Sequence, residues 1–497
     1  MMKYFLTFDV GTTAMKCILF DSDFNEVFCA NKEYSIEARA QGMAEIDAHT
    51  YFETFRQCVN EIWMAGISSD DVATITFTTQ GETLIPVDKD GKELSKAIVW
   101  LDTRAEAEAD IIQKQIPADV LYKTTGLGGI DGALPAAKVL WMYRNEPDLY
   151  EKTHKFLLLE DYLIYRLTGK FVSEKSLQSS TGWYDITGDA FYDRMLEVCK
   201  IDIDKLPEVL PCGVIVGTVA SEVAAACGLS EKTIITTGAM DQISSAIGVG
   251  NMEEGMCTET TGTALVVGAT TANPAFDVNN PITIYKHFDE KFIYMPYSNT
   301  AGMTLKWFKD KVMPYAVKEA EERGISVYDV VTENAATSPV GSKGVIMLPQ
   351  LSEAGAFLGL SLATETADLA RSVLEGVAYM LRDLIEQVEA QGVIVNELYS
   401  LGGGSYSSLW CQIKADVCKK KIVCNDYAQT TSLGAAILGA AAVGQYTDVT
   451  EALKVLRTTK KEFMPNESNF EAYDKGYERY KKYFKIYNAQ EIGRAHV

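Results

Sequence analysis

The residues best suited to chemistry lie in a short turn near the amino terminus, Asp9-Val10-Gly11-Thr12-Thr13, followed by Lys16. One apolar run enters this turn and a second leaves it, which is typical of a β-hairpin with a glycine at its tip. The backbone N–H groups, the two hydroxyls and the lysine are donors that suit phosphate oxygens, whereas the carboxylate suits a magnesium ion. The pattern also occurs in ordinary turns, so a purely structural turn stays open.

A second turn of the same kind occurs about half a chain later, at Thr261-Gly262-Thr263, between predicted strands 256–260 and 263–267. Two such hairpins predict a duplicated domain with a ligand shared by the two copies. Before the second hairpin, a predicted strand at 234–237 runs into a turn, 238–241, and a helix begins at Gln242. Asp241 in that turn could act as a general base, although a helix N-cap explains it more simply at this point.

A glycine run, Gly402-Gly403-Gly404, follows a predicted strand at 397–401 and precedes a helix that begins at about Ser407. Glycines let a ligand approach the backbone, and a helix N-terminus offers N–H donors, so this segment could bind a nucleotide. A tight structural turn is the alternative. The chain has neither the Gly-x-x-x-x-Gly-Lys-Ser/Thr pattern nor the later glycine of a dinucleotide fingerprint, which disfavours both of those enzyme classes.

The elements that must position these residues alternate between strands and helices, which indicates a mixed α/β protein. The predicted strands are 4–9, 15–21, 25–35, 72–79, 83–87 and 97–101; the predicted helices are 48–64, 105–113, 136–143, 156–167, 367–391 and 432–443. A chain of 497 residues exceeds one ordinary core. We therefore expect an N-terminal lobe at 1–247 and a C-terminal lobe at 248–490. Residues 492–497 resemble a translated sequencing adapter, and we expect 491–497 to be a non-native tail.

Composition limits the classes of partner. The formal net charge of −22 argues against a nucleic-acid or anionic-membrane surface. Apolar runs of membrane-spanning length and an N-terminal signal pattern are both missing from the sequence. Ten scattered cysteines without a Cys-x-x-Cys pattern, and four histidines without metal-ligand spacing, predict a reduced, cytoplasmic protein without a zinc site.

Taken in this order, the motifs resemble the FGGY family of carbohydrate kinases. The stretch 355–360, then Asp368-Leu369 and 372–375, matches that family's C-terminal signature, and 135–138 with Trp141 and Asn145 resembles its N-terminal signature, from which Ala133 departs. The resemblance covers about residues 3–445. It implies an α/β, two-lobed, actin-like (ribonuclease H-like) ATPase fold, with duplicated domains around mixed central sheets. ATP would lie in the cleft and the sugar in the N-terminal lobe.

The resemblance also implies roles for single residues, with ATP and Mg²⁺ as cofactors. It assigns Asp9 to magnesium and ATP, and it assigns Asp241 to the catalytic base. The groups assigned to phosphates are Gly11, Thr12, Thr13, Gly262 and Thr263, and those assigned to adenosine are Gly402, Gly403 and Gly404. Phosphoryl transfer depends on positioning and charge stabilisation, and one carboxylate must accept the proton of the attacking hydroxyl.

The acceptor side is less defined. Candidate substrate ligands at predicted strand ends are Gln80, Gly81, Glu82, Trp100, Asp102 and Gln242; for Glu82 a solvated turn carboxylate is the alternative. Glycerol kinases resemble this chain at the first site but have arginine where it has Gly81, and tyrosine where it has Ala133; both departures predict a larger pocket. Xylulokinases have Gln-Met-His-Gly there, which Gly81 and Glu82 do not match.

We therefore predict a kinase for a pentulose, with glycerol or another polyol as the alternative. A non-catalytic actin-fold protein that binds nucleotide or sugar is a second alternative. The expected partner is a small sugar or polyol, with no nucleic acid and no membrane, and a homodimer is left open.

Overall fold

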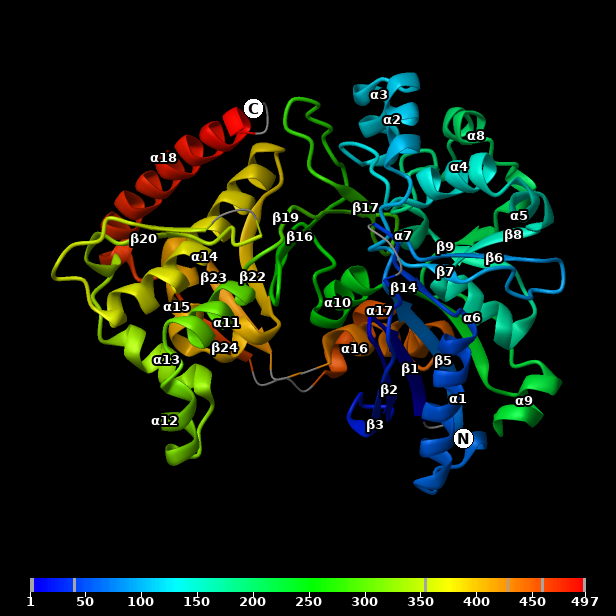
Figure 1. Cartoon of the computed structure of the whole chain (residues 1–497). Helices are drawn as coiled ribbons and strands as arrows, with labels where there is room; N and C mark the ends of the chain where they lie inside the picture. Colours follow the sequence, from blue (N-terminus) through cyan, green and yellow to red (C-terminus); the bar gives the residue numbers. More distant parts are fainter. Residues whose placement is uncertain are drawn as a thin grey trace. The chain divides into compact units, whose positions relative to one another are not determined.

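The computed structural model describes residues 4–38, 42–352, 355–425, 427, 429–456 and 460–494 (Figure 1). Contacts divide the chain into two compact units. Unit 1 comprises Met1–Met252, Ala272–Ile293 and Tyr427–Arg457, and unit 2 comprises Glu253–Thr271, Tyr294–Asp426 and Thr458–Val497. The lobes at 1–247 and 248–490 stay a prediction. Of the predicted tail, 491–494 continue the backbone of the last helix, and 495–497 lie outside the described residues.

The main sheet of unit 1 has the strand order β13-β14-β5-β1-β2-β3. Its strands are β1 (Tyr4–Val10), β2 (Ala14–Phe20), β3 (Glu26–Glu33), β5 (Val72–Thr79), β13 (Ile215–Thr218) and β14 (Ile234–Met240). The three central strands β14, β5 and β1 run parallel, whereas β2, β3 and β13 run antiparallel to their neighbours. The predicted opening meander of three strands is therefore confirmed.

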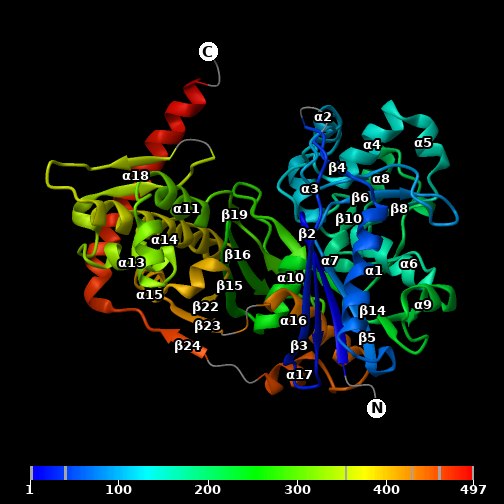
Figure 2. The ribbon, with the colours of Figure 1, turned by 60° about the horizontal axis from the view of Figure 1, so that its bottom comes forward.

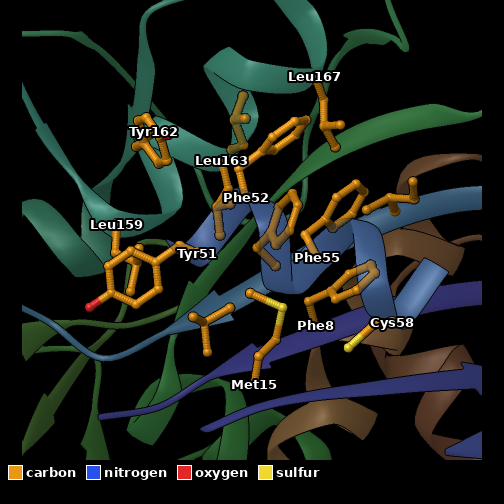
Figure 3. Close-up of a cluster of buried hydrophobic side chains, with 14 of the residues drawn as sticks. Phe8, Met15, Tyr51, Phe52, Phe55, Cys58, Leu159, Tyr162, Leu163 and Leu167 are labelled. Carbon is orange, nitrogen blue, oxygen red and sulfur yellow. The ribbon is translucent and has the colours of Figure 1, made fainter. Parts of the chain in front are cut away.

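Helices cover both faces of this sheet. On one face, α1 (His49–Met64) and α6 (Leu159–Thr168) pack against a buried aromatic cluster, in which the ring of Phe8 lies 4.7 Å from that of Phe55 and 5.5 Å from that of Phe77 (Figure 3). Side chains alternate between faces along a strand, so Thr74 and Thr76 of β5 face the other side from Phe77. There they meet Gly439 of α16 (Thr430–Ala442).

The helix α16 also packs against α10 (Asp241–Val249) (Figures 1 and 2). A Cβ on Gly434 would lie 1.9 Å from the carbonyl oxygen of Ser244, and a Cβ on Gly248 would lie 2.0 Å from that of Thr430. Only glycine allows this approach of two backbones. The helix predicted at 432–443 is present as α16, and its tight packing supports the helix that begins at Asp241.

Unit 2 repeats the pattern of unit 1. Its sheet contains β16 (Leu265–Thr271), β15 (Gly255–Thr261), β22 (Val395–Leu401), β23 (Lys421–Asn425) and β24 (Lys460–Phe463), in that order. The strand β15 forms an antiparallel hairpin with β16 and pairs in parallel with β22; β22 pairs in parallel with β23, and β24 closes the edge antiparallel. The same sequence of pairings in unit 1 confirms the predicted duplication.

The remaining elements extend or surround these sheets. In unit 1 they are β4 (Glu45–Ile46), β6 (Leu84–Val87), β7 (Ala97–Ile98), β8 (Lys155–Leu158), β9 (Val172–Glu174), β10 (Tyr184–Asp185), β11 (Ala190–Phe191), β12 (Glu208–Leu210), β17 (Ile284–Lys286), α2 (Glu106–Gln115), α3 (Ala118–Thr125), α4 (Pro135–Asn145), α5 (Pro147–Lys152), α7 (Lys175–Gln178), α8 (Asp193–Cys199), α9 (Ser221–Cys227) and α17 (Val449–Val455). The others are β18 (Phe292–Tyr294), β19 (Tyr297–Ser298), β20 (Ile346–Leu348), β21 (Ala356–Leu358), α11 (Gly302–Lys311), α12 (Ala316–Arg323), α13 (Val327–Ala336), α14 (Thr366–Ala390), α15 (Ser408–Cys418) and α18 (Phe470–Arg494). Within the described residues, every helix is too short or too polar to cross a membrane.

Three predicted elements differ from the structure. The strand predicted at 97–101 ends at Ile98. The helix predicted at 156–167 is strand β8 followed by α6, because the apolar run Phe156–Leu159 has no period that separates strand from helix, and pairing with β6 decides for strand. The turn predicted at 238–241 is wrong, since β14 continues through Met240 and α10 begins at Asp241.

Candidate functional site

Three chemistry-bearing segments of unit 1 begin at one edge of its sheet. Val10 of β1 and Met240 of β14 both lie opposite Thr79 of β5 in the parallel register. The next residues along the chain, Gly11, Gln80 and Asp241, therefore leave the sheet at its carboxyl edge. In α/β proteins this edge is where ligands bind.

The first hairpin forms a small polar hollow. Asp9, Gly11, Thr12, Thr13 and Lys16 line a cavity of about 290 Å³. Burial raises the pKa of Asp9 above its ordinary value. The positive charge of Lys16, its cross-strand partner, offsets part of this increase. The hollow thus joins one carboxylate to hydroxyl and ammonium donors, as the sequence predicts for a phosphate and metal turn.

Side chains from elsewhere in unit 1 hold this hairpin. The hydroxyl of Tyr34 donates to the carbonyl oxygen of Gly11 at 2.5 Å, and Lys16 donates to Oε1 of Gln429 at 2.7 Å. The indole Nε1 of Trp100 donates to the hydroxyl of Thr12 at 2.9 Å. Trp100, predicted as a substrate ligand, is 38% exposed and so presents its ring beside the hairpin.

Asp241 is the first residue of α10 and is not its N-cap, which is Met240. Its Oδ1 accepts the N–H of Gln242 at 2.6 Å. Burial, and secondly the charge of Asp9, raise the pKa of Asp241 to about 7. A carboxylate with a pKa near neutrality at the end of a strand can accept a proton from a hydroxyl at physiological pH.

The strand end before Asp241 is fixed by side chains that the sequence analysis missed. The N–H of Gly238 donates to Oε1 of Glu160 at 2.7 Å, and the N–H of Met240 donates to Oγ of Ser176 at 2.9 Å. The same serine hydroxyl donates to Oε1 of Glu174 at 2.7 Å. Charged residues inside the apolar run Leu157–Tyr162 were the available signal, since such residues are rarely buried without a partner.

Glu82 lies in an acidic part of unit 1. It has a positive φ of 65°, which is uncommon for a residue with a side chain. Burial raises the pKa of Glu82 to about 7; Lys138 opposes this, and Asp131 and Asp241 add to it. The ammonium of Lys138 donates to the carbonyl oxygens of Glu82 and Val99, at 3.2 and 3.0 Å. Glu82 is therefore close to the candidate base and is not a solvated turn residue.

The other predicted acceptor ligands are placed differently. Asp102 is fully buried, and its carboxylate accepts the N–H of Ala44 at 2.7 Å and three N–H groups of Arg104. We expect it to position Arg104 rather than to contact substrate. Gln80 is 4% exposed and donates to the hydroxyl of Thr83 at 3.0 Å. Gln242 is partly exposed at the start of α10.

Gly81 lies against two other side chains of unit 1. A Cβ at this position would lie 3.1 Å from Oγ of Ser180 and 3.2 Å from Sδ of Met240. These two side chains therefore lie directly beside Gly81, and the effect of this glycine on the size of the acceptor pocket stays a prediction.

Unit 2 contains the larger cavity, of about 590 Å³, within the size range of small-molecule sites. The predicted residues Gly262, Thr263, Gly403 and Gly404 line it, which brings the second hairpin and the glycine run together. Gly402 is the first residue after β22. It has φ 72° and ψ −169°, a conformation that only glycine adopts readily. A Cβ there would lie 2.9 Å from the carbonyl oxygen of Thr261.

The rest of the cavity wall comes from residues that the sequence analysis did not assign. They are Thr261, Gly302, Met303, Leu305, Lys306, Ser326, Tyr328, Asp329, Thr332, Tyr406, Ser407 and Trp410. Gly302 must be glycine, because a Cβ would lie 2.3 Å from the carbonyl oxygen of Gly262. The exposed rings of Tyr328 and Tyr406 suit a planar base. Apart from Thr261, which belongs to the second hairpin, no local motif marks these residues, since they come from separate segments of the chain.

Comparisons with known proteins agree with this arrangement. The model for the FGGY family of carbohydrate kinases, N-terminal domain, matches residues 4–248, and the C-terminal domain model matches residues 257–443. Three relatives cover nearly the whole chain. A glycerol kinase of Thermococcus gammatolerans is 30% identical, covering 94% of each chain; a xylulose kinase of Staphylococcus xylosus is 25% identical, covering 97% of this chain and 99% of its own; a gluconokinase of Bacillus subtilis is 26% identical, covering 90% and 88%.

Among solved structures, the xylulose kinase from Rhodospirillum rubrum superposes with a TM-score of 0.90 at 23% identity, over 98% of this chain and 99% of its own. This likeness shows the same fold. The family resemblance and the actin-like fold class predicted from the sequence are both confirmed.

Proposed function

The chain belongs to the FGGY family of carbohydrate kinases, and we propose that it transfers the terminal phosphate of ATP to a hydroxyl of a neutral pentulose. The observation that carries the proposal is Asp241, a carboxylate with a pKa of about 7 at the carboxyl edge of the unit 1 sheet. In its ionised form this group accepts the proton of the attacking hydroxyl. The oxygen then forms a bond to the terminal phosphorus as the bond to ADP breaks.

The charge around Asp241 supports a neutral acceptor over an acid such as gluconate. Glu82 interacts electrostatically with both Asp131 and Asp241, and this negative charge would repel a substrate carboxylate. Two nearby cations are already engaged: Lys138 with two carbonyl oxygens, and Arg104 with Asp102 and Glu45. Carboxylates accept hydrogen bonds from hydroxyls, so this cluster suits a polyhydroxylated sugar.

The segment around Ala133 supports an acceptor longer than glycerol. Ala133 is small and partly exposed, and its N–H donates to Oδ1 of Asp131 at 2.9 Å. Asp131 is exposed, so it is available as a further acceptor for a distant hydroxyl. A pentulose has four carbons beyond the phosphorylated one and glycerol has two, so a pentulose has more oxygens for such partners.

We propose that the nucleotide base lies in the cavity of unit 2 beside the hairpin at Gly262–Thr263, and that this hairpin and the hairpin at Gly11–Thr13 of unit 1 are phosphate-binding turns. Asp9 would hold Mg²⁺. In the described residues, no three Asp, Glu, His or Cys side chains could hold a metal by themselves, which fits Mg²⁺, usually bound by one or two carboxylates together with substrate phosphates. When bound, Mg²⁺ neutralises charge that develops on the phosphate oxygens.

The test is ADP release by the purified chain with ATP, Mg²⁺ and one acceptor at a time, followed in a coupled assay. The panel contains xylulose, another pentulose, a hexulose, glycerol and gluconate. We expect the highest kcat/KM for a pentulose. Preference for glycerol, which the 30% identical glycerol kinase would favour, or for gluconate would refute the pentulose assignment.

A further inference from the structure

A fully buried ion pair lies behind the nucleotide cavity of unit 2. Lys414 of α15 donates to Oε1 of Glu259 of β15 at 2.7 Å, and both side chains are 0% exposed. Removing two charges from water is costly, and a well-packed apolar pair is often as stable. The pair therefore calls for a role other than stability.

The lysine is bonded to the second hairpin as well as to its counter-ion. Its Nζ donates to Oγ1 of Thr261 at 2.8 Å, and this hydroxyl donates to Oε2 of Glu259 at 2.7 Å. The hydroxyl of Ser400, on the neighbouring strand β22, also donates to Glu259. Thr261 is the last residue of β15, directly before Gly262, so the network ends at the turn that faces the cavity.

Two further residues that line the cavity lie close to the same ammonium group. A Cβ on Gly404 would lie 3.1 Å from Nζ of Lys414 and 2.7 Å from Cβ of Thr261. The ring of Trp410, one turn earlier on α15, lies 5.1 Å from that Nζ. Thr261, Gly404 and Trp410 all line the cavity, whereas Lys414 does not. Lys414 thus contacts the cavity wall from behind at three points.

We propose that Lys414 is a positioning residue for the nucleotide: it fixes the hydroxyl of Thr261, and thereby the conformation of the turn at Gly262 and Thr263, with Glu259 as its counter-ion. The inference rests on the proposed function, which puts phosphates at this hairpin. Because Glu259 balances the charge of Lys414, we expect Lys414 to influence nucleotide affinity through the position of the hairpin and not through its charge. This influence should therefore be largest for ligands that carry phosphates.

The competing account is that Lys414 only neutralises Glu259. The variants Lys414→Met and Lys414→Met with Glu259→Gln separate the two. The single variant leaves a buried carboxylate unpaired and should be unstable in either account. The double variant removes both charges, so a merely neutralising lysine is no longer needed. The control is Arg371→Met with Glu375→Gln, which removes the buried pair of α14 away from the cavity.

Binding of ADP and of adenosine is measured by calorimetry, and kcat and the KM for ATP by the coupled assay. We expect the double variant to bind ADP about tenfold more weakly, the size of one lost hydrogen bond to a charged group, with adenosine affinity within about twofold. The KM for ATP should rise by a similar factor with kcat little changed. The control pair should bind ADP as the wild type does.

Wild-type ADP affinity in the double variant would overturn the inference, and so would an equal loss for ADP and adenosine. If the double variant does not fold, Thr261→Val provides the second measurement, because it removes only the hydroxyl that Lys414 holds. Unchanged ADP affinity in Thr261→Val would likewise overturn it. A wild type that binds ADP but phosphorylates none of the sugars would refute the proposed function and leave this inference standing.

Discussion

Asp241→Asn tests both the charge and the role of the candidate base. Asparagine keeps the oxygen that accepts the N–H of Gln242 at 2.6 Å, so the start of α10 is preserved, but it cannot take a proton from a hydroxyl. We expect kcat to fall by about 10³-fold, within the usual range for a lost general base. Binding of ADP should be unchanged, because the cavity proposed for the nucleotide base lies in unit 2, whereas Asp241 belongs to unit 1.

The stability of the same variant should rise with pH relative to the wild type. A pKa that rises from 3.8 in the unfolded chain to about 7 in the folded chain corresponds to about 4 kcal/mol. Asp241 is partly exposed, so we halve this for solvent screening and expect about 2 kcal/mol. The folded wild type holds the proton more tightly than the unfolded chain, so its stability is greatest below pH 4 and decreases until about pH 7.

Urea-unfolding midpoints of both proteins at pH 5 and pH 8 measure this effect. Asparagine does not titrate, so the variant should be more stable by about 2 kcal/mol at pH 8 and by less than about 1 kcal/mol at pH 5. The exposed Asp110→Asn in α2 is the matched control and should show no such difference. Undiminished phosphorylation by Asp241→Asn would refute the base assignment, and the same stability difference between the two proteins at pH 5 and pH 8 would refute the raised pKa of Asp241.

Three further changes test other parts of the site. Gly402→Ala would place a Cβ 2.9 Å from the carbonyl oxygen of Thr261, in a backbone conformation that costs about 1–3 kcal/mol for a residue with a side chain. Calorimetry should therefore show weaker ADP binding, and wild-type affinity would contradict this expectation. Gly434→Val should separate α16 from α10 and lower the melting temperature by several degrees, because its Cβ would lie 1.9 Å from a backbone oxygen; an unchanged melt would contradict this packing. Chelation of Mg²⁺ should stop phosphoryl transfer, and Asp9→Asn should raise the Mg²⁺ concentration needed for half-maximal rate; equal Mg²⁺ dependence would remove Asp9 from the metal site.

Much of the site could be predicted because its parts are local in sequence. Each of the two hairpins depends on a few adjacent residues, namely the apolar runs that lie before and after Gly11 and Gly262. The glycine run at Gly402 follows its strand directly. Their order along the chain was enough to recognise the family.

Other features depended on segments far apart in the chain. The period of the run at 156–159 could not distinguish strand from helix until β6 paired with it. Asp102 has the residue type of a sugar ligand, but Ala44 and Arg104 use its carboxylate inside the protein. The side chain of Ser180, about a hundred residues later, lies beside Gly81. Burial and partners of a side chain are properties of packing, which residue type alone does not specify.

The sequence by itself therefore determined the two glycine-containing hairpins and the duplicated α/β plan, because hydrophobic period and turn residues act between neighbours. Only the tertiary structure decided which polar groups face a ligand and which are used to hold the fold. Lys414 and Glu259 are 155 residues apart and lie in no motif, yet they meet behind the second hairpin. Such pairs form because parallel strands and their helices bring distant residues to one sheet edge, and their energetics depend on burial that no local pattern encodes.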